Sequence, residues 1–107
     1  MHARVVAIQI RPGKMDGAVA IYRDSVVPSL KECKGLGGAH LFTDPVSGKG
    51  LMLTLWESEA DLRAVEASGW FREEIARFQA VLGSPPSREH YEVSVTVQAA
   101  TLEEEQR

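Results

Sequence analysis

The sequence predicts an α+β fold, a four-stranded antiparallel sheet with two helical segments on one face. Segments of strand character alternate with segments of helical periodicity in the order β-α-β-β-α-β. Short connections, together with right-handed crossovers, favour a ferredoxin-like sheet with the first and third strands at its centre. We therefore expect the strand order 4-1-3-2.

Composition is that of a soluble globular protein. The chain has 107 residues, of which 44% are hydrophobic and 25% charged, and its net charge is −3. We expect one domain over residues 1–100 and a polar, disordered tail over 101–107. The absence of a basic run argues against nucleic acid as a partner.

The single cysteine, Cys33, excludes an internal disulfide and fits a reducing compartment. No apolar run is long enough to span a bilayer, and the N-terminus lacks the apolar core of a signal peptide. We therefore expect a cytoplasmic protein with no membrane partner.

The first strand is predicted over residues 3–10, where apolar side chains fall on both faces of the pleat: Val6, Ile8 and Ile10 on one, Val5 and Ala7 on the other. A strand that is apolar on both faces is typical of the middle of a sheet.

The first helical segment is predicted over residues 14–32. Its apolar residues recur every three or four positions: Met15, Val19, Tyr22, Val26 and Leu30. Pro28 lacks a backbone donor, so we expect a kink or break there. A glycine-rich stretch follows, then a short strand over 39–43, and the turn residues 44–50 predict a hairpin to the next strand.

Residues 50–82 are predicted to form a buried strand that leads directly into a long, broken helix. Leu51, Leu53 and Leu55 share one face of a strand, and Met52, Thr54 and Trp56 share the other. Ser58 is a good helix N-cap. Gly69 interrupts the helical stripe that follows, whose members are Leu62, Val65, Phe71, Ile75, Phe78 and Leu82.

The last strand is predicted over residues 90–98. Its apolar residues alternate with polar ones in the pattern of a half-buried edge strand: Tyr91, Val93, Val95 and Val97. The complete arrangement is ferredoxin-like, and its helices cover one face of the sheet. The other face, with some of Val5, Ala7, Met52 and Trp56, needs another cover, and a second copy of the chain is the simplest one.

Two stretches resemble a known family. TLWESEADLRAVEASGWFREEI, residues 54–75, resembles the LWESEEA…S..F signature of antibiotic-biosynthesis-monooxygenase-like (ABM) domains, and PSLKECKGLGG, residues 28–38, is similar to that family's helix end and strand entry. The resemblance covers residues 3–98. It implies the fold of the dimeric α+β barrel superfamily, in which two ferredoxin-like sheets pair as a homodimer.

The resemblance also implies chemistry. The superfamily includes haem-degrading enzymes that use an asparagine, a tryptophan and a histidine, but this sequence has no asparagine and places Val65 and Ile75 at the other two positions. An aliphatic side chain cannot ligate iron, so we expect no haem. We expect no other cofactor either. The implied function is a cofactor-independent monooxygenase acting on a small aromatic or polyketide-like molecule. The alternative is a non-catalytic dimer that binds a small hydrophobic ligand or serves as an accessory module.

Four residues are candidates for a site. His40 is the candidate general base, because imidazole titrates near neutral pH. Trp56, Tyr22 and His90 are candidates for lining a ligand pocket, although a tryptophan at a strand-to-helix junction is more commonly structural, and we expect Trp56 to be buried in either role. Three scattered histidines and no cysteine pair predict no metal site.

Overall fold

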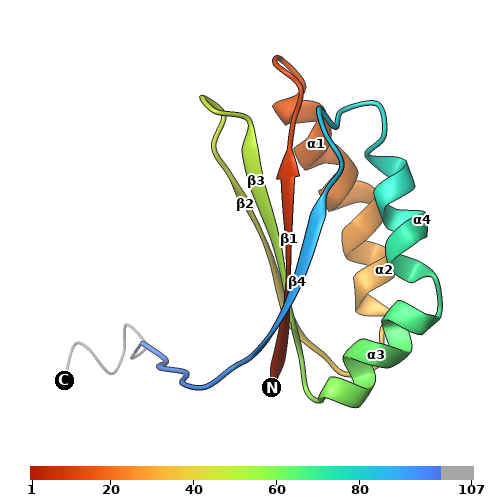
Figure 1. Ribbon diagram of the computed structural model, residues 1–107, viewed down its shortest axis with the longest axis vertical. Helices are drawn as coiled ribbons and strands as arrows, with labels where there is room; N and C mark the ends of the chain where they lie inside the picture. The colour runs from red at the N-terminus through yellow and green to blue at the C-terminus, as the bar shows by residue number, and fades with distance from the viewer. Residues whose placement is uncertain (100–107) are drawn as a thin grey trace.

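The computed structural model describes residues 1–99 as a sheet covered on one side by helices (Figure 1). In chain order the elements are β1 His2–Gln9, α1 Met15–Ile21, the π-helix η1 Tyr22–Val26, α2 Val27–Lys31, β2 Leu36–Thr43, β3 Lys49–Trp56, α3 Glu59–Ala67, α4 Trp70–Arg77 and β4 Ser87–Glu92. The strands are antiparallel in the order β2-β3-β1-β4, which confirms the predicted fold and its strand order. The predicted tail, 101–107, lies outside the described residues.

The hydrophobic core lies between the sheet and the helices. Its buried members include Val6 and Ile8 of β1, Met52 of β3 and Phe78 after α4. Residues directly opposite each other in a ladder share a face of the sheet, and Val6 lies opposite Met52. The helix side of β3 is therefore the side of Met52, Thr54 and Trp56, all of them buried.

The opposite face of the sheet is bare. We expected Met52 and Trp56 to be candidates for that face, and this expectation is wrong because the register with β1 turns both toward the helices. Since β3 is apolar on both faces, its own pattern could not show which face is covered. The side chains of the bare face include Ala3, Val5, Ala7, His40, Phe42, Leu51, Leu53, Leu55 and Tyr91.

The first helical segment runs through Pro28 without stopping. Ahead of it, Tyr22–Val26 form a π-helix, and the Val27 N–H donates to the Tyr22 carbonyl five residues earlier. The expected break is thus a single wide turn placed just before the proline, and α2 continues beyond it.

The second helical segment is broken at Gly69, as expected. Ser58 caps α3, its Oγ accepting a hydrogen bond from the Asp61 N–H at 3.1 Å. Gly69 has a φ of 81°, a left-handed conformation that ends α3 and starts α4. Within residues 1–99, no helix has both the length and the apolar character to cross a membrane.

The last strand differs from its predicted bounds. β4 begins at Ser87 and ends at Glu92, where it pairs with His2, the first residue of β1. One more hydrogen bond joins the Val93 N–H to the Met1 carbonyl at 2.9 Å. The structure has no strand over 93–98, so the predicted strand over 90–98 is wrong in its second half.

Candidate functional site

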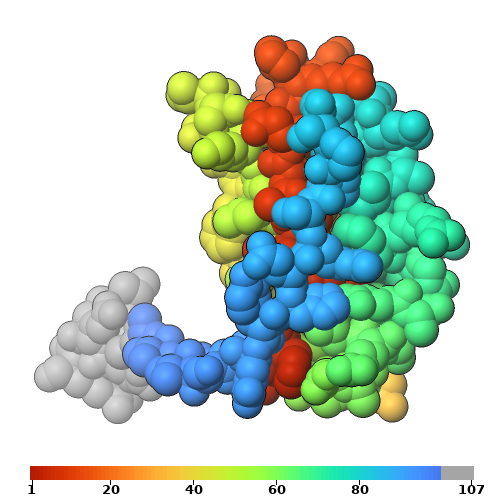
Figure 2. Space-filling view, viewed as in Figure 1, coloured from red at the N-terminus to blue at the C-terminus, as the bar shows by residue number. Residues whose placement is uncertain are grey.

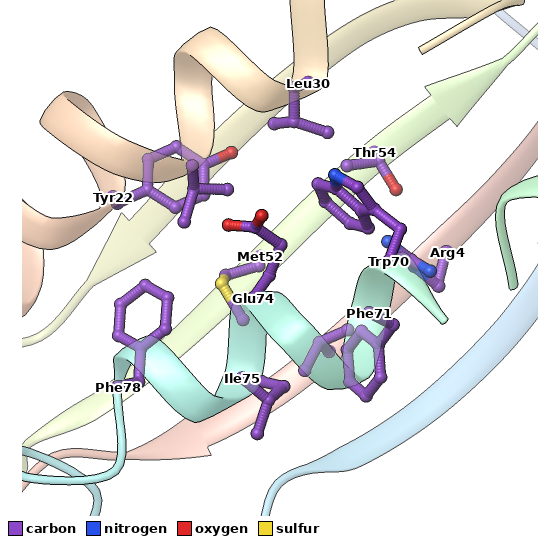
Figure 3. A pocket seen from close by; sticks show the side chains of 12 residues that line it. Arg4, Tyr22, Leu30, Met52, Thr54, Trp70, Phe71, Glu74, Ile75 and Phe78 are labelled. Carbon is purple, nitrogen blue, oxygen red and sulfur yellow. The ribbon is translucent and has the colours of Figure 1, made fainter. Parts of the chain in front are cut away.

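A cavity lies between the sheet and the helices, near the middle of the core. Its volume is about 20 Å³, room for about one water molecule. Most of its wall is apolar, but four polar side chains reach it. Its lining consists of Arg4, Val6, Tyr22, Val26, Leu30, Met52, Thr54, Trp70, Phe71, Glu74, Ile75 and Phe78 (Figure 3).

Arg4 brings a buried positive charge to the cavity. Its side chain is 2% exposed, and its Cζ lies 5.3 Å from the ring centroid of Trp70 and 5.0 Å from that of Phe71. Glu66 Oε1 is 3.9 Å from its Nη1, yet neither Nε nor Nη1 has a hydrogen-bond partner. Burial lowers the pKa of the Arg4 guanidinium, and the negative charge of Glu66 opposes that shift.

Glu74 brings a buried negative charge from α4. It is 4% exposed, and Figure 3 shows its carboxylate pointing into the space between Tyr22 and Trp70. Arg77 Nε lies 3.4 Å from Glu74 Oε2, but this oxygen has no hydrogen-bond partner. A carboxylate in this state is available to accept a proton or a hydrogen bond from a molecule in the cavity.

Tyr22 supplies the third buried polar group. It opens the π-helix, a wide turn that presents both Tyr22 and Val26 to the cavity. Its hydroxyl is buried and has no hydrogen-bond partner. Burial raises the pKa of the Tyr22 phenol, so at neutral pH the hydroxyl is protonated and can donate a hydrogen bond.

Of the four candidates from sequence, only Tyr22 lines the cavity. Trp56 is 0% exposed, as expected, but its indole N–H donates to Thr54 Oγ1 at 2.9 Å and its ring is not part of the cavity wall. His40 lies on the bare face of the sheet, stacked on Phe42 with ring centroids 5.7 Å apart. The structure therefore separates His40 from Tyr22 by the thickness of the sheet.

His90 lies on the helix side of the sheet but at its edge. It is opposite Arg4 in the β1–β4 ladder, and its Nε2 contacts the Glu66 carboxylate. His2 and Glu59 line the same surface hollow, with His2 Nε2 3.6 Å from Glu59 Oε2. Even so, no group of three or more histidine, cysteine, aspartate or glutamate residues in the described part of the chain is placed to hold a metal ion.

Arg4 and Glu74 were missed from the sequence, although both carry a signal. Arg4 has the same parity as Val6, Ile8 and Ile10, so it is a charge on the covered face of a central strand. Glu74 lies three residues after Phe71 and four before Phe78, within the apolar stripe of its helix. A charge placed on an apolar face is the feature that could have identified both.

Fold and cavity together define a class: a ferredoxin-like α+β domain with its polar groups enclosed between sheet and helices. The model of the family described as antibiotic biosynthesis monooxygenase (ABM) matches residues 1–93. The chain belongs to this family, as the resemblance implied.

Solved structures show the same fold at low sequence identity. A monooxygenase of Streptomyces coelicolor, in complex with nanaomycin D, superposes with a TM-score of 0.72 at 20% identity, over 92% of each chain. A protein of unknown function from Nitrosomonas europaea gives a TM-score of 0.69 at 23% identity, over 94% of this chain and 95% of the other. At these identities the likeness concerns the fold alone.

Among curated proteins, an uncharacterised protein of Mycobacterium tuberculosis is 34% identical over 64 residues. The match covers 60% of this chain and 27% of the length of that protein. The similarity therefore lies in about a quarter of that protein. Because that protein is itself uncharacterised, it indicates no activity for this chain.

Proposed function

We propose that this chain is a cofactor-independent monooxygenase whose substrate is a small aromatic or polyketide-like molecule with an ionisable hydroxyl group. The cavity between the sheet and the helices is the proposed site. Membership of the ABM family supports the reaction class, and the groups inside the cavity support the kind of substrate.

One observation carries the proposal: three polar side chains are buried at the cavity, and each has an atom without a hydrogen-bond partner. A buried polar group without a partner costs about 1–3 kcal/mol, and more when it is charged. Arg4, Tyr22 and Glu74 together place a guanidinium, a phenol and a carboxylate there. A ligand that pairs with all three would remove this cost, and the apolar wall would hold its ring system.

The roles of the three side chains follow from their chemistry. Glu74 accepts the proton of the substrate hydroxyl and leaves an electron-rich anion. Arg4 stabilises the developing negative charge, and Tyr22 donates a hydrogen bond that orients the substrate. The carbanion form of that anion adds molecular oxygen at a ring carbon that bears a hydrogen, and a C–O bond and a peroxide form. The O–O bond then breaks as that hydrogen leaves, so one oxygen becomes the carbonyl of a quinone and the other leaves as water. The substrate supplies all four electrons and both hydrogens of the water. His40 lies on the other face of the sheet, so we assign the base to Glu74 instead.

The small volume of the cavity favours a second candidate function. Pockets for drug-sized ligands measure about 300–1,000 Å³, and this cavity is far smaller, so the wall must move before a ring system can enter. A cavity that stays closed would fit a non-catalytic accessory module. Met52, with its flexible side chain, and the short helix α4 are the parts of the wall best suited to move.

Oxygen uptake in the presence of dihydroxynaphthalenes tests the proposal, with the oxidised product identified by mass spectrometry. Glu74→Gln removes the base, and we expect the rate to fall by about 10²–10⁴-fold. Glu73→Gln is the matched control, because it is the same change at the exposed neighbour on α4 and should leave the rate unchanged. Full activity in Glu74→Gln would contradict the assignment. A rate that falls in His40→Gln but not in Glu74→Gln would contradict it as well.

We also propose that two copies pair through the bare face of the sheet. Phe42 and Leu51 are large apolar residues that remain exposed on this face in the single chain, and Tyr91 of β4, opposite Ala3, is half-exposed on the same face farther along the sheet. An apolar sheet face of this kind is typical of an interface. Sedimentation equilibrium gives the mass directly, and a monomer at micromolar concentration would contradict the pairing.

A further inference from the structure

A second hollow lies just outside the inner cavity and shares part of its wall. It is found at the edge of the helix layer, between α4 and the edge strand β4, and its volume is about 330 Å³. That volume falls in the range of small-molecule pockets, which the inner cavity does not reach. Figure 2 shows β4 and α4 next to each other on the visible face, with side chains of β4 reaching over to α4. We call this space the outer hollow, and its lining consists of Glu66, Gly69, Phe71, Arg72, Ile75 and Arg88.

Phe71 belongs to the wall that divides the outer hollow from the inner cavity. Its ring is half-buried and lines both spaces, as does Ile75 one turn later on α4. The Arg4 Cζ lies 5.0 Å from the centroid of this ring, and the Arg88 Cζ lies 4.8 Å from it. Arg4 lines only the inner cavity and Arg88 only the outer hollow, so the ring contacts one guanidinium group from each space.

Phe71 is also the part of this wall that is free to turn. Its neighbour Trp70 is tethered, because the indole N–H donates to Ser29 Oγ of α2 at 2.6 Å. The Phe71 ring has no polar atom, so its rotation breaks no hydrogen bond. A rotation would join the inner cavity to the outer hollow, and the joined space has the volume that a ring system needs.

The outer hollow carries two positive charges that lack ion-pair partners. Among residues 1–99, neither Arg72 nor Arg88 forms an ion pair. The carboxylate in the lining, that of Glu66, contacts His90 Nε2 and lies 3.9 Å from Arg4 Nη1 instead. A guanidinium group can bind a planar carboxylate through two parallel hydrogen bonds, so the free pair is suited to an organic acid.

We propose that the outer hollow is a second subsite for the ligand, which binds a carboxylate through Arg72 and Arg88. This inference rests on the proposed function, in which the reacting hydroxyl lies beside Arg4 and Glu74 in the inner cavity. The ligand is then an aromatic acid with its hydroxyl and its carboxylate at opposite ends of the ring system. The Cζ atoms of Arg4 and Arg88 are no farther apart than the path through the Phe71 ring centre, which a two-ring molecule can span.

Two naphthols that differ only in a carboxylate test the subsite. The first, 2-naphthol, carries the hydroxyl alone, whereas 6-hydroxy-2-naphthoate has a carboxylate at the far end of the same rings. Isothermal titration calorimetry gives both dissociation constants without any need for oxygen uptake. We expect the acid to bind at least about tenfold more tightly, because charge-assisted hydrogen bonds hold its carboxylate.

Removal of the two charges should remove this preference. In Arg72→Gln with Arg88→Gln, we expect the two dissociation constants to agree within about threefold. The matched control is Arg23→Gln with Lys31→Gln, which takes the same net charge from exposed side chains outside the outer hollow. This control should keep the preference for the acid.

The outcomes separate the subsite from the proposed reaction. Equal affinities in the parent protein, or a preference that survives in the Arg72 and Arg88 variant, would overturn the subsite and leave the inner site standing. No binding of either naphthol would contradict both. A preference for the acid that depends on the two arginines, combined with full oxygen uptake in Glu74→Gln, would support the subsite and contradict only the reaction.

Phe71→Ala tests the connection between the two spaces. Loss of the ring opens a path between them, so we expect 6-hydroxy-2-naphthoate to associate about tenfold faster, followed by its fluorescence in a stopped-flow instrument. Phe71→Leu is the milder change, which keeps an apolar side chain there, and should give a smaller increase. Circular dichroism checks that both variants fold. A folded Phe71→Ala protein, or a folded Phe71→Leu protein if the first does not fold, that associates at the parent rate would overturn the path past Phe71.

Discussion

Arg4 and Glu74 are charged residues placed where a soluble domain normally keeps apolar ones. Each is less than a twentieth exposed, and each has an atom without a hydrogen-bond partner. Cation–π contacts with Trp70 and Phe71 stabilise the arginine in part, but they leave its Nε and Nη1 free for a ligand. At the scale of single residues, the proposed site therefore consists of groups whose burial costs stability and which a ligand would supply with hydrogen-bond partners.

Trp56 differs from Arg4 and Glu74, because it belongs to the hydrophobic core and its indole N–H is paired. It is 0% exposed, and its indole N–H is satisfied by Thr54. Trp56→Ala should lower the free energy of unfolding by about 3–5 kcal/mol through lost burial and a new cavity. Urea denaturation measures this change, and a loss below about 1 kcal/mol would mean that the ring is not core.

Tyr22 predicts a specific dependence of stability on pH. Burial raises the pKa of its phenol in the folded chain, whereas in the unfolded chain the pKa is about 10. As the pH rises above about 10 the unfolded chain loses this proton first, so the folded state loses stability. Tyr22→Phe should show a smaller fall in unfolding free energy over the same range.

The comparison with Tyr22→Phe isolates this residue. The pKa of Tyr91 is also raised, by its hydrogen bond with Glu89, but Tyr91 is present in both proteins. If the two unfolding profiles coincide above about pH 10, the buried phenol does not have the raised pKa that its environment implies.

The chemistry of the site could be predicted from the sequence only in part. Tyr22 was found because it lies in a clear helical stripe, and the burial of Trp56 followed from its apolar neighbours. His40 was favoured because imidazole has a useful pKa, but only the pairing of β2 with β3 shows which face it occupies. Arg4 and Glu74 are not among the four sequence candidates, although each is a charged residue on an apolar face.

At the scale of elements, two local irregularities shape the cavity. The π-helix before Pro28 turns Tyr22 and Val26 toward it, and the left-handed Gly69 starts α4 at the angle that brings Trp70 and Glu74 into the wall. Both irregularities could be anticipated as breaks in the sequence. Their consequence for the site could not, because it depends on how the helices lie against the sheet.

Gly69 and Gly17 form a matched pair for testing this geometry. No atom lies within 4 Å of a Cβ placed on Gly69, so the cost of Gly69→Ala is the left-handed backbone alone, about 1–2 kcal/mol. Gly17, within α1, would meet only Val81 at 3.8 Å, and Gly17→Ala should stabilise the fold by about 0.5–1 kcal/mol. Thermal unfolding of both variants measures these changes. A Gly69→Ala protein as stable as the parent would contradict the left-handed conformation of Gly69.

The last strand shows where a local pattern stops being sufficient. Its alternation continues to Val97, but β4 ends at Glu92, which pairs with His2 at the start of β1. Strand character depends on the residues themselves, whereas strand length depends on the partner.

At the scale of the whole molecule, the two faces of the sheet have different proposed roles. Its helix side encloses the cavity, and its bare side is the proposed interface between copies. The fold could be predicted because strand order follows from short connections and from which strands are apolar on both faces. Each face could be assigned its role only once the register between β1 and β3 was known.

The central claim is that a ligand binds between Arg4, Tyr22 and Glu74 on the helix side of the sheet. A crystal structure of the chain soaked with a dihydroxynaphthalene tests it most directly. We predict density for the ring system within the widened cavity, with one oxygen beside the Arg4 guanidinium and another beside the Glu74 carboxylate. Density only on the bare face, beside His40 and Phe42, would contradict the account.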